Sequence, residues 1–150
     1  LFPLPPDGTD AAVLGLGATI NTSTRAIAAD DFFLGLFETA LADGELITSI
    51  SFPIPTRAAY SKFPQPASRF AMVGVFVAAT TGGARVAVTG AGASVFRVSA
   101  MEQSLNGEWA VASVAGVSVS PDGLNADLHG SARYRAHLTT VMAERAVEAA

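Results

Sequence analysis

The clearest hydrophobic pattern lies in the middle of the chain, where three apolar runs follow one another. They are rich in valine, alanine and phenylalanine and cover residues 58–64, 69–80 and 84–92. Runs of this length and composition favour β-strands. The residues Thr81-Gly82-Gly83 between the last two runs are typical of a tight hairpin turn. The pattern therefore predicts a strand-rich centre that folds back on itself.

The middle run is apolar on both faces that a strand presents. Its large side chains form two sets: Phe70, Met72 and Phe76 in one, and Val73, Val75 and Val77 in the other. A strand that is buried on both faces reads as a continuous apolar run, because neither face meets water. We therefore expect a central strand that helices cover on at least one side.

Helical periodicity marks the end of the chain, residues 131–150. Tyr134, Leu138 and Val141 recur at the spacing of one helix face and predict the stripe that packs on the sheet. The polar residues of the segment are expected on the opposite face: Arg133, Arg135, His137, Glu144 and Arg145.

Two shorter helices are predicted between the strands and this last helix. Residues 99–107 begin with Ser99 and Glu102, which have the spacing of a capping box, and end on Asn-Gly. Residues 108–116 form the second, which contains Trp109, the only tryptophan.

The first third of the chain predicts short elements. Residues 10–18 favour a helix with Asp10 as its cap. β-Branched residues at positions 19–29 favour a short hairpin. Residues 45–53 read as a strand that stops at Pro53.

A second helix is expected near the acidic pair Asp30 and Asp31. Negative side chains at this place would cap the helix and meet the positive end of its dipole. Phe33 and Phe37, four positions apart, would then lie on one side.

Strands grouped in the middle and helices grouped at the end predict an α+β fold, with a small antiparallel sheet packed against three helices. Two prolines interrupt the pattern around residues 52–59, and the strand-rich part begins there. A boundary between two parts of the chain is therefore expected near this position.

Composition limits the functions that such a fold could serve. Half of the 150 residues are hydrophobic, and the formal net charge is −4. No run of basic residues could follow a phosphate backbone, so we expect no nucleic-acid partner. The absence of cysteine excludes disulfides, thiolate zinc sites and cysteine nucleophiles.

The apolar segments are too short for a membrane span, and the first ten residues lack the pattern of an export signal. We therefore expect a cytoplasmic setting. The chain opens on Leu1 with three prolines in six residues, which reads as the inside of a longer protein. A removed leader or an expression artefact are the alternatives.

Residues with familiar catalytic roles form no recognised constellation. Ser94 lies in a sequence that lacks the second glycine of a nucleophile elbow. His129 and His137 have no carboxylate beside them at metal-ligand spacing, so a surface or capping role is favoured. The pair Glu144 and Glu148 fits a solvated helix face. We expect neither a catalytic residue nor a metal site.

Lys62 stands apart, because it is the only lysine among nine basic residues. It lies in a predicted strand between Tyr60 and Phe63. A compact ammonium group can donate to a ring carbonyl or a phosphate. An ordinary exposed strand lysine is the alternative.

The order of the segments resembles the FAD-carrying medium subunit of the molybdenum hydroxylases, the family of xanthine dehydrogenase and carbon monoxide dehydrogenase. The resemblance begins near Gly15 and rests on four short stretches taken in order: Asp31-Phe32-Phe33, Thr39-Ala40-Leu41, Glu45-Leu46-Ile47 and Tyr134-Arg135. It implies that residues 1–55 are the end of an FAD-binding part and residues 56–150 a complete C-terminal domain.

This resemblance also implies a role in electron transfer. Substrate would be oxidised in a molybdopterin-binding large subunit, and electrons would pass through a small subunit with two [2Fe-2S] clusters to FAD. The medium subunit of such an oxidoreductase holds the flavin and carries out no substrate chemistry, so the protein groups serve to position and tune it.

By the same resemblance, Ile47 covers the flavin ring, Lys62 lies near it, and Phe70 falls near a further contact. The family commonly has an acidic residue around Arg69, where this chain departs from it. The glycine-rich loops that hold the FAD phosphates are not found in this sequence, so the chain alone is expected to bind FAD weakly or not at all. The alternative function is a stand-alone protein-interaction domain that has lost flavin binding.

Overall fold

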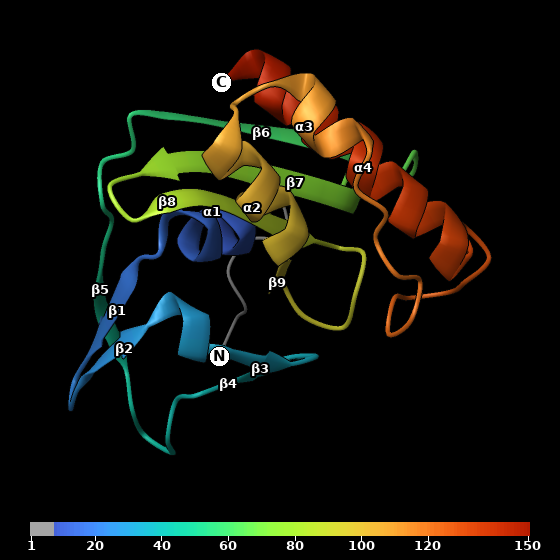
Figure 1. The fold of residues 1–150 in the computed structure, drawn as a ribbon. Coiled ribbons are helices and arrows are strands. Elements are labelled where there is room, and N and C mark those ends of the chain that lie inside the picture. Colours follow the sequence, from blue (N-terminus) through green and yellow to red (C-terminus); the bar gives the residue numbers. More distant parts are fainter. Residues whose placement is uncertain (1–7) are drawn as a thin grey trace.

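A four-stranded antiparallel sheet forms the centre of the molecule. The computed structural model describes residues 8–150, so the expectation for the first seven residues lies outside the described part. The sheet has the order β6-β7-β8-β9 (Figure 1). Its strands are β6 (Arg57–Pro64), β7 (Ala71–Thr80), β8 (Gly83–Thr89) and β9 (Phe96–Arg97). The three predicted strands are confirmed, and the short β9 adds a fourth.

The predicted hairpin turn joins β7 to β8. Thr80 pairs with Gly83, so only Thr81 and Gly82 lie between the two strands. Gly83 has a φ of 109°, which is a conformation that glycine adopts readily and other residues avoid. The backbone conformation at the end of this turn therefore favours glycine at position 83.

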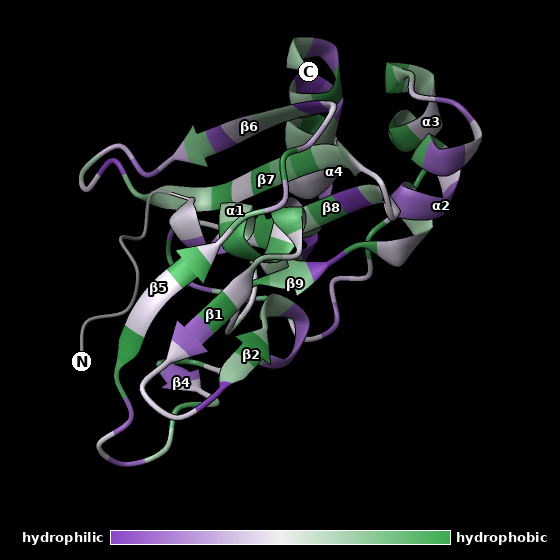
Figure 2. Cartoon of the chain, turned by 90° about the vertical axis from the view of Figure 1, so that its left-hand side faces the viewer, coloured by the Kyte–Doolittle hydropathy of each residue, from purple (hydrophilic) through white to green (hydrophobic). Residues whose placement is uncertain are grey.

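Helices cover both faces of the sheet, which confirms the expectation for its central strand and extends it. Helix α1 (Thr9–Leu16) packs on β7 and β8 from one side, and α4 (Ala132–Ala149) packs on β6 and β7 from the other. Figure 2 shows α1 in front of the sheet and α4 behind it. α2 (Ser99–Gly107) lies on β8, and α3 (Val111–Ala115) contacts α4.

Side chains of β7 point to both faces of the sheet and enter two different hydrophobic cores. The fully buried Val75 and Val77 belong to the core that includes α2 and α4. Phe76 points the other way and packs against α1, where a Cβ at Gly15 would come within 2.5 Å of its ring. Close approach of α1 to the sheet therefore requires glycine at position 15.

The last helix is confirmed, but its faces differ from the prediction. Leu138 is buried as expected, Val141 is half-buried, and Tyr134 is 41% exposed. Arg135, expected on the polar face, is only 4% exposed. The face that meets the sheet is centred on Met142 and on small residues, because alanine lets the helix approach the strands closely.

Three predicted helix caps are wrong. In helix α2 Val98 takes the N-cap position and Ser99 is the first helical residue, so no capping box forms. Glu102 accepts hydrogen bonds from Arg97 and the Val86 amide instead. Helix α1 begins after Gly8 instead of Asp10. The third cap is that of the helix predicted near Asp30, which does not form.

The second of the two predicted short helices is shorter than expected. The helix expected over residues 108–116 is confirmed in its second half, as α3. Trp109 precedes α3 and packs against the core, with the Arg57 guanidinium 5.4 Å from its ring centroid.

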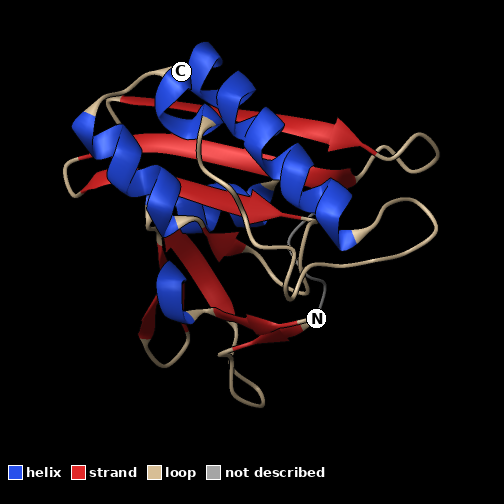
Figure 3. Cartoon of the chain, turned by 45° about the vertical axis from the view of Figure 1, so that its right-hand side comes forward, coloured by secondary structure: helices blue, strands red, loops and turns tan. Residues whose placement is uncertain are grey.

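The first third of the chain builds a second, three-stranded antiparallel sheet with the order β2-β1-β5. In Figure 3 this part of the chain lies below the four-stranded sheet. Its strands are β1 (Thr19–Thr22), β2 (Ala26–Ala28) and β5 (Ile47–Ser51). The predicted hairpin and the predicted strand before Pro53 are both confirmed. The α+β fold with helices layered on a small antiparallel sheet is therefore the observed architecture.

The second helix predicted near Asp30 is wrong. A single 3-10 turn, η1 (Ala29–Asp31), leads into a small hairpin of β3 (Phe33–Gly35) and β4 (Glu38–Thr39). Phe32 is the side chain that enters the core, at 2% exposure, whereas Phe37 is 85% exposed at the hairpin tip. The spacing of Phe33 and Phe37 imitates a helix face, although the chain reverses between them.

Phe37 occupies a strained backbone position, because its φ is 58°. Residues with a Cβ lose roughly 1 kcal/mol or more in this left-handed region, while asparagine adopts it more easily. We expect Phe37→Asn to raise the free energy of unfolding by about 0.5 kcal/mol, whereas Phe37→Ala gives no such gain. Urea denaturation of the three proteins measures the difference, and equal stability of the Asn and Ala variants would contradict the assignment of strain.

Within residues 8–150, no helix combines the length and the apolar character that crossing a membrane requires.

Candidate functional site

The structure brings two of the three predicted flavin contacts together at one end of β6 and β7. Lys62 lies on β6, and its Nζ donates a hydrogen bond of 3.3 Å to the backbone oxygen of Arg69. Phe70 follows directly and is 51% exposed. A basic donor on β6 therefore binds the short loop that presents an exposed aromatic ring.

This loop is closed by its own backbone. The Gln65 amide donates to the oxygen of Phe70 at 2.7 Å, and the Arg69 amide donates to the oxygen of Gln65 at 2.9 Å. Arg69 has a φ of 65°, which a non-glycine residue adopts only when its surroundings hold it there. Lys62 binds the carbonyl of that residue, so the lysine also helps to fix the loop that presents Phe70.

Ile47, the third predicted contact, lies on the other sheet. It is the first residue of β5 and is 37% exposed, and the preceding Leu46 is 59% exposed. Large apolar side chains on a surface are informative when they gather in sequence and in space. The segment Leu46–Ile47 is thus an exposed apolar feature at the edge of the three-stranded sheet.

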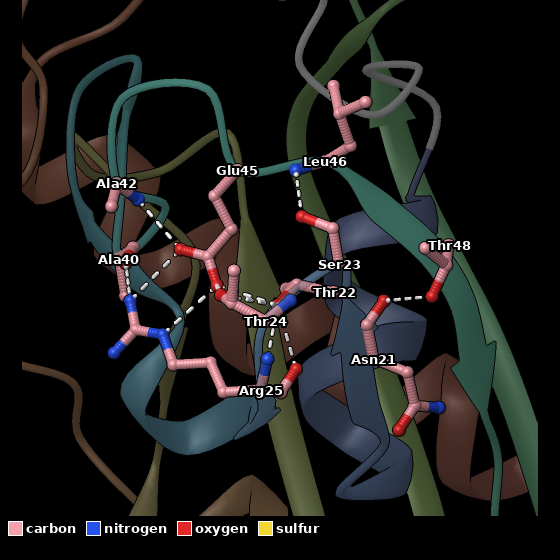
Figure 4. A network of polar contacts seen from close by, with 10 residues as sticks. All are labelled: Asn21, Thr22, Ser23, Thr24, Arg25, Ala40, Ala42, Glu45, Leu46 and Thr48. Atoms are coloured by element: carbon pink, nitrogen blue, oxygen red, sulfur yellow. Dashed lines mark hydrogen bonds and ion pairs between the residues drawn. The ribbon is translucent and has the colours of Figure 1, made fainter.

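A buried carboxylate stands immediately before these two residues. Glu45 is 3% exposed and accepts hydrogen bonds from five donors (Figure 4). The donors come from the β1–β2 turn and from the loop before Glu45: Thr22 Oγ1 at 2.6 Å, Thr24 Oγ1 at 2.8 Å, Arg25 Nε at 3.1 Å, Arg25 Nη2 at 3.2 Å and the Ala42 amide at 2.8 Å. Arg25 also donates to the oxygen of Ala40.

These donors hold the pKa of Glu45 well below its usual value, the Arg25 side chain first and the Ala42 amide second. A carboxyl with a lowered folded-state pKa contributes stability that is fully present above its unfolded pKa of about 4.3 and is lost as the pH falls toward the folded value. We therefore expect the melting temperature to fall between about pH 5 and pH 2, and Glu45→Gln to flatten this fall.

Thermal unfolding followed by circular dichroism at a series of pH values measures this effect. Glu148→Gln, an identical change on the exposed side of α4, serves as the control and should keep the native pH profile. Equal profiles for the two variants would show that Glu45 carries none of the acid sensitivity.

Arg135 joins the last helix to the ends of β7 and β8. Its Nη1 donates to the oxygens of Met72 and Gly90 at 2.8 and 3.2 Å, and its Nη2 contacts Asp127 at 2.7 Å. The pKa of Asp127 is lowered, first by the His129 amide and then also by Arg135. Because Met72 follows Phe70 by two residues, this arginine holds the start of β7 directly after the predicted aromatic contact.

Asp30 also has a role other than the predicted cap. It accepts hydrogen bonds from Arg85 at 2.8 Å and from Arg97 at 3.0 Å. Partial burial opposes ionisation, but the two arginines outweigh it and lower the pKa of Asp30. The acidic side chain thereby ties η1 to β8 and β9.

The remaining candidates lie elsewhere. Ser94 lines an open cavity of about 530 Å³ between β9, the start of α2 and residues 118–124, which includes none of the three predicted flavin contacts. His129 and His137 are exposed. In the part of the chain that the structure describes, no three His, Asp or Glu side chains are grouped in a way that could hold a metal ion.

No family model matches the sequence. The nicotine 6-hydroxylase medium subunit of Paenarthrobacter nicotinovorans is 33% identical over 134 residues, which cover 82% of this chain and 47% of that protein. The carbon monoxide dehydrogenase medium chain of Afipia carboxidovorans is 28% identical and is matched over 97% of this chain and 56% of its own length. The chain belongs to the medium-subunit family of the molybdenum hydroxylases.

Solved structures agree with membership in the medium-subunit family. A Cu,Mo-CO dehydrogenase in its cyanide-inactivated form matches 96% of this chain and 56% of its own chain, with a TM-score of 0.77 and 25% identity. Quinoline 2-oxidoreductase from Pseudomonas putida 86 matches 97% of this chain and 56% of its own, with a TM-score of 0.81 and 22% identity, which shows the shared fold. The chain spans about half the length of the curated relatives it matches.

The sequence does not reveal that two charged residues of this chain, Glu45 and Arg135, are buried and bind several partners. Glu45 belongs to a stretch that carries the resemblance, but nothing local indicates burial, because its side-chain partners Thr22, Thr24 and Arg25 lie 20 to 23 positions earlier. Arg135 reads as one of several surface arginines. The adjacent Tyr134 has the apolar helix spacing but remains partly exposed.

Proposed function

We propose that the chain is the part of a medium subunit that contributes Ile47, Lys62 and Phe70 to an FAD site. The electrons would come from [2Fe-2S] clusters of a small subunit, after substrate oxidation in a molybdopterin-binding large subunit, and would leave to an acceptor. The relationship to a nicotine 6-hydroxylase medium subunit is the observation that carries this proposal. Substrate oxidation itself is assigned to the large subunit.

The side chains at the start of β5 and those at the loop between β6 and β7 fit the ring part of a flavin. Ile47 and Phe70 offer apolar surface, and Lys62 offers a hydrogen-bond donor close to Phe70. A flat ring system with carbonyl groups at one edge requires this combination of apolar contact and fixed donors. When bound, FAD supplies the redox chemistry, while these side chains exclude water from the ring and hold it in place.

The same proposal divides the chain near Pro55, with residues 1–55 belonging to the FAD-binding part and residues 56–150 forming the C-terminal domain. Contacts between the two parts are extensive, since α1 packs on β7 and β8 and Asp30 pairs with arginines of the four-stranded sheet. We infer that the C-terminal domain acts as a rigid support for the flavin contacts. A cytoplasmic setting remains a prediction.

Purification of the native assembly tests the proposed function. An affinity tag on this chain, introduced in the source organism, should retrieve a yellow complex with flavin absorbance. The complex should contain two further subunits that carry molybdopterin and iron, and denaturation of the protein should release FAD into the supernatant. A colourless protein without these subunits would contradict the proposal.

A second candidate, the stand-alone interaction domain without flavin, has one observation in its favour. Leu34, Leu36 and Phe37 on the β3–β4 hairpin are 58%, 65% and 85% exposed, which is an apolar tip suited to contact with another protein. A colourless assembly that contains a different partner would support this candidate over the first.

A further inference from the structure

Leu46 and Ile47 are exposed, yet their backbone is held in place on several sides. The Ser23 amide donates to the oxygen of Leu46 at 2.8 Å, and the Leu46 amide donates to Ser23 Oγ at 3.3 Å (Figure 4). Apolar side chains that face solvent gain nothing from such rigidity in the free protein. Rigid presentation is useful when the side chains must meet a ligand, because less freedom is lost on binding.

A β-bulge sets the direction of Ile47. Ile47 pairs with Thr22 of β1, whereas Ser49 pairs with Asn21, so Thr48 is an additional residue in β5. Thr48 Oγ1 donates to the oxygen of Asn21 at 3.1 Å and fixes the bulge. Bulges re-aim side chains and are frequent beside functional sites.

Glu45 unites the parts that create this arrangement. Its carboxylate binds the turn that contains Ser23 and, through the Ala42 amide, the loop that leads to Leu46. Arg25 balances its charge and fastens the oxygen of Ala40 in the same loop. Loss of the carboxylate charge would therefore free both sides of the Leu46–Ile47 segment at once.

We propose that Glu45 is a positioning residue that holds Leu46 and Ile47 in the orientation from which Ile47 contacts the flavin ring. The proposal rests on the proposed function, because it takes the flavin as the ligand of Ile47. Because Glu45 is buried, it would act through the backbone of the two residues that follow it.

The test uses the native assembly with Glu45→Gln introduced in this chain, and two measurements. We expect FAD to dissociate about 10-fold faster than from the unmodified assembly, which corresponds to about 1.4 kcal/mol. We also expect faster hydrogen exchange in peptides that cover residues 40–47, with unchanged exchange in β7 and α4. A purely structural role would leave FAD dissociation unaffected once the folded assembly is isolated.

Glu148→Gln is the matched control, since it makes the same chemical change on an exposed helix position. If Glu45→Gln disrupts assembly, Ser23→Ala replaces it, because this variant removes only the hydroxyl that accepts from the Leu46 amide. FAD retention equal to that of the control in the variant that assembles overturns the proposal. An unmodified assembly without flavin overturns the proposed function itself, so the two failures are distinguishable.

Discussion

Replacement of Arg135 by methionine is expected to lower the free energy of unfolding by about 3 kcal/mol. Methionine keeps the apolar stem but removes the Arg135 donor to the Met72 oxygen and one of the two side-chain donors to the Gly90 oxygen, which keeps only Asn125 Nδ2 at 3.4 Å. A buried carbonyl without a donor costs about 1–3 kcal/mol, and Arg135 is 4% exposed. For a chain of this size the melting temperature should fall by roughly 6–12 °C.

Arg133→Met provides the control for this prediction. Arg133 lies on the same helix, two residues earlier, and is exposed. Its replacement should change the stability by no more than about 0.5 kcal/mol. Equal effects of the two substitutions in urea denaturation would mean that Arg135 belongs to the polar face, as its sequence pattern indicates, and that the buried contacts are absent in solution.

The second large effect is expected for Gly90→Ala. Gly90 has a φ of 77°, and a Cβ there would lie 2.4 Å from the backbone oxygen of Ala71. The left-handed backbone costs roughly 1–2 kcal/mol for alanine, and displacement of a strand adds roughly 1–3 kcal/mol. We therefore expect a loss of about 3 kcal/mol in unfolding free energy, together with displacement of the strand that follows Phe70.

Gly123→Ala separates the two causes. Gly123 has almost the same φ, 78°, but a Cβ there would meet no atom within 4 Å. This variant should lose only the backbone contribution, about 1 kcal/mol. Guanidinium denaturation of both variants gives the difference, and a loss at position 123 as large as that at position 90 would argue against the close contact with Ala71.

The sequence predicts well those elements whose pattern is local and long. Strands β7 and β8 follow from their continuous apolar runs, and the position of helix α4 follows from its helical spacing, although its buried face is centred on other residues than the predicted stripe. The expected helix at Asp30 fails because Phe33 and Phe37 have helical spacing by coincidence. Phe32 provides the buried anchor, and the chain reverses at Leu36 and Phe37.

Polar residues are the main source of error, because their burial depends on partners far along the chain. Arg135 binds carbonyls 63 and 45 residues away, and Glu45 binds hydroxyls 23 and 21 residues away. Periodicity assigns charged residues to solvent by default. The candidate site shares this limit: Lys62 and Phe70 are close in sequence, and Lys62 binds the loop that carries Phe70, whereas Ile47 comes from a separate sheet.

The position of the flavin relative to this chain is the central claim, and an experimental structure of the flavin-loaded native assembly tests it most directly. We expect the flavin ring to contact Ile47, Lys62 and Phe70 together. A ring bound elsewhere, away from all three side chains, would contradict the account.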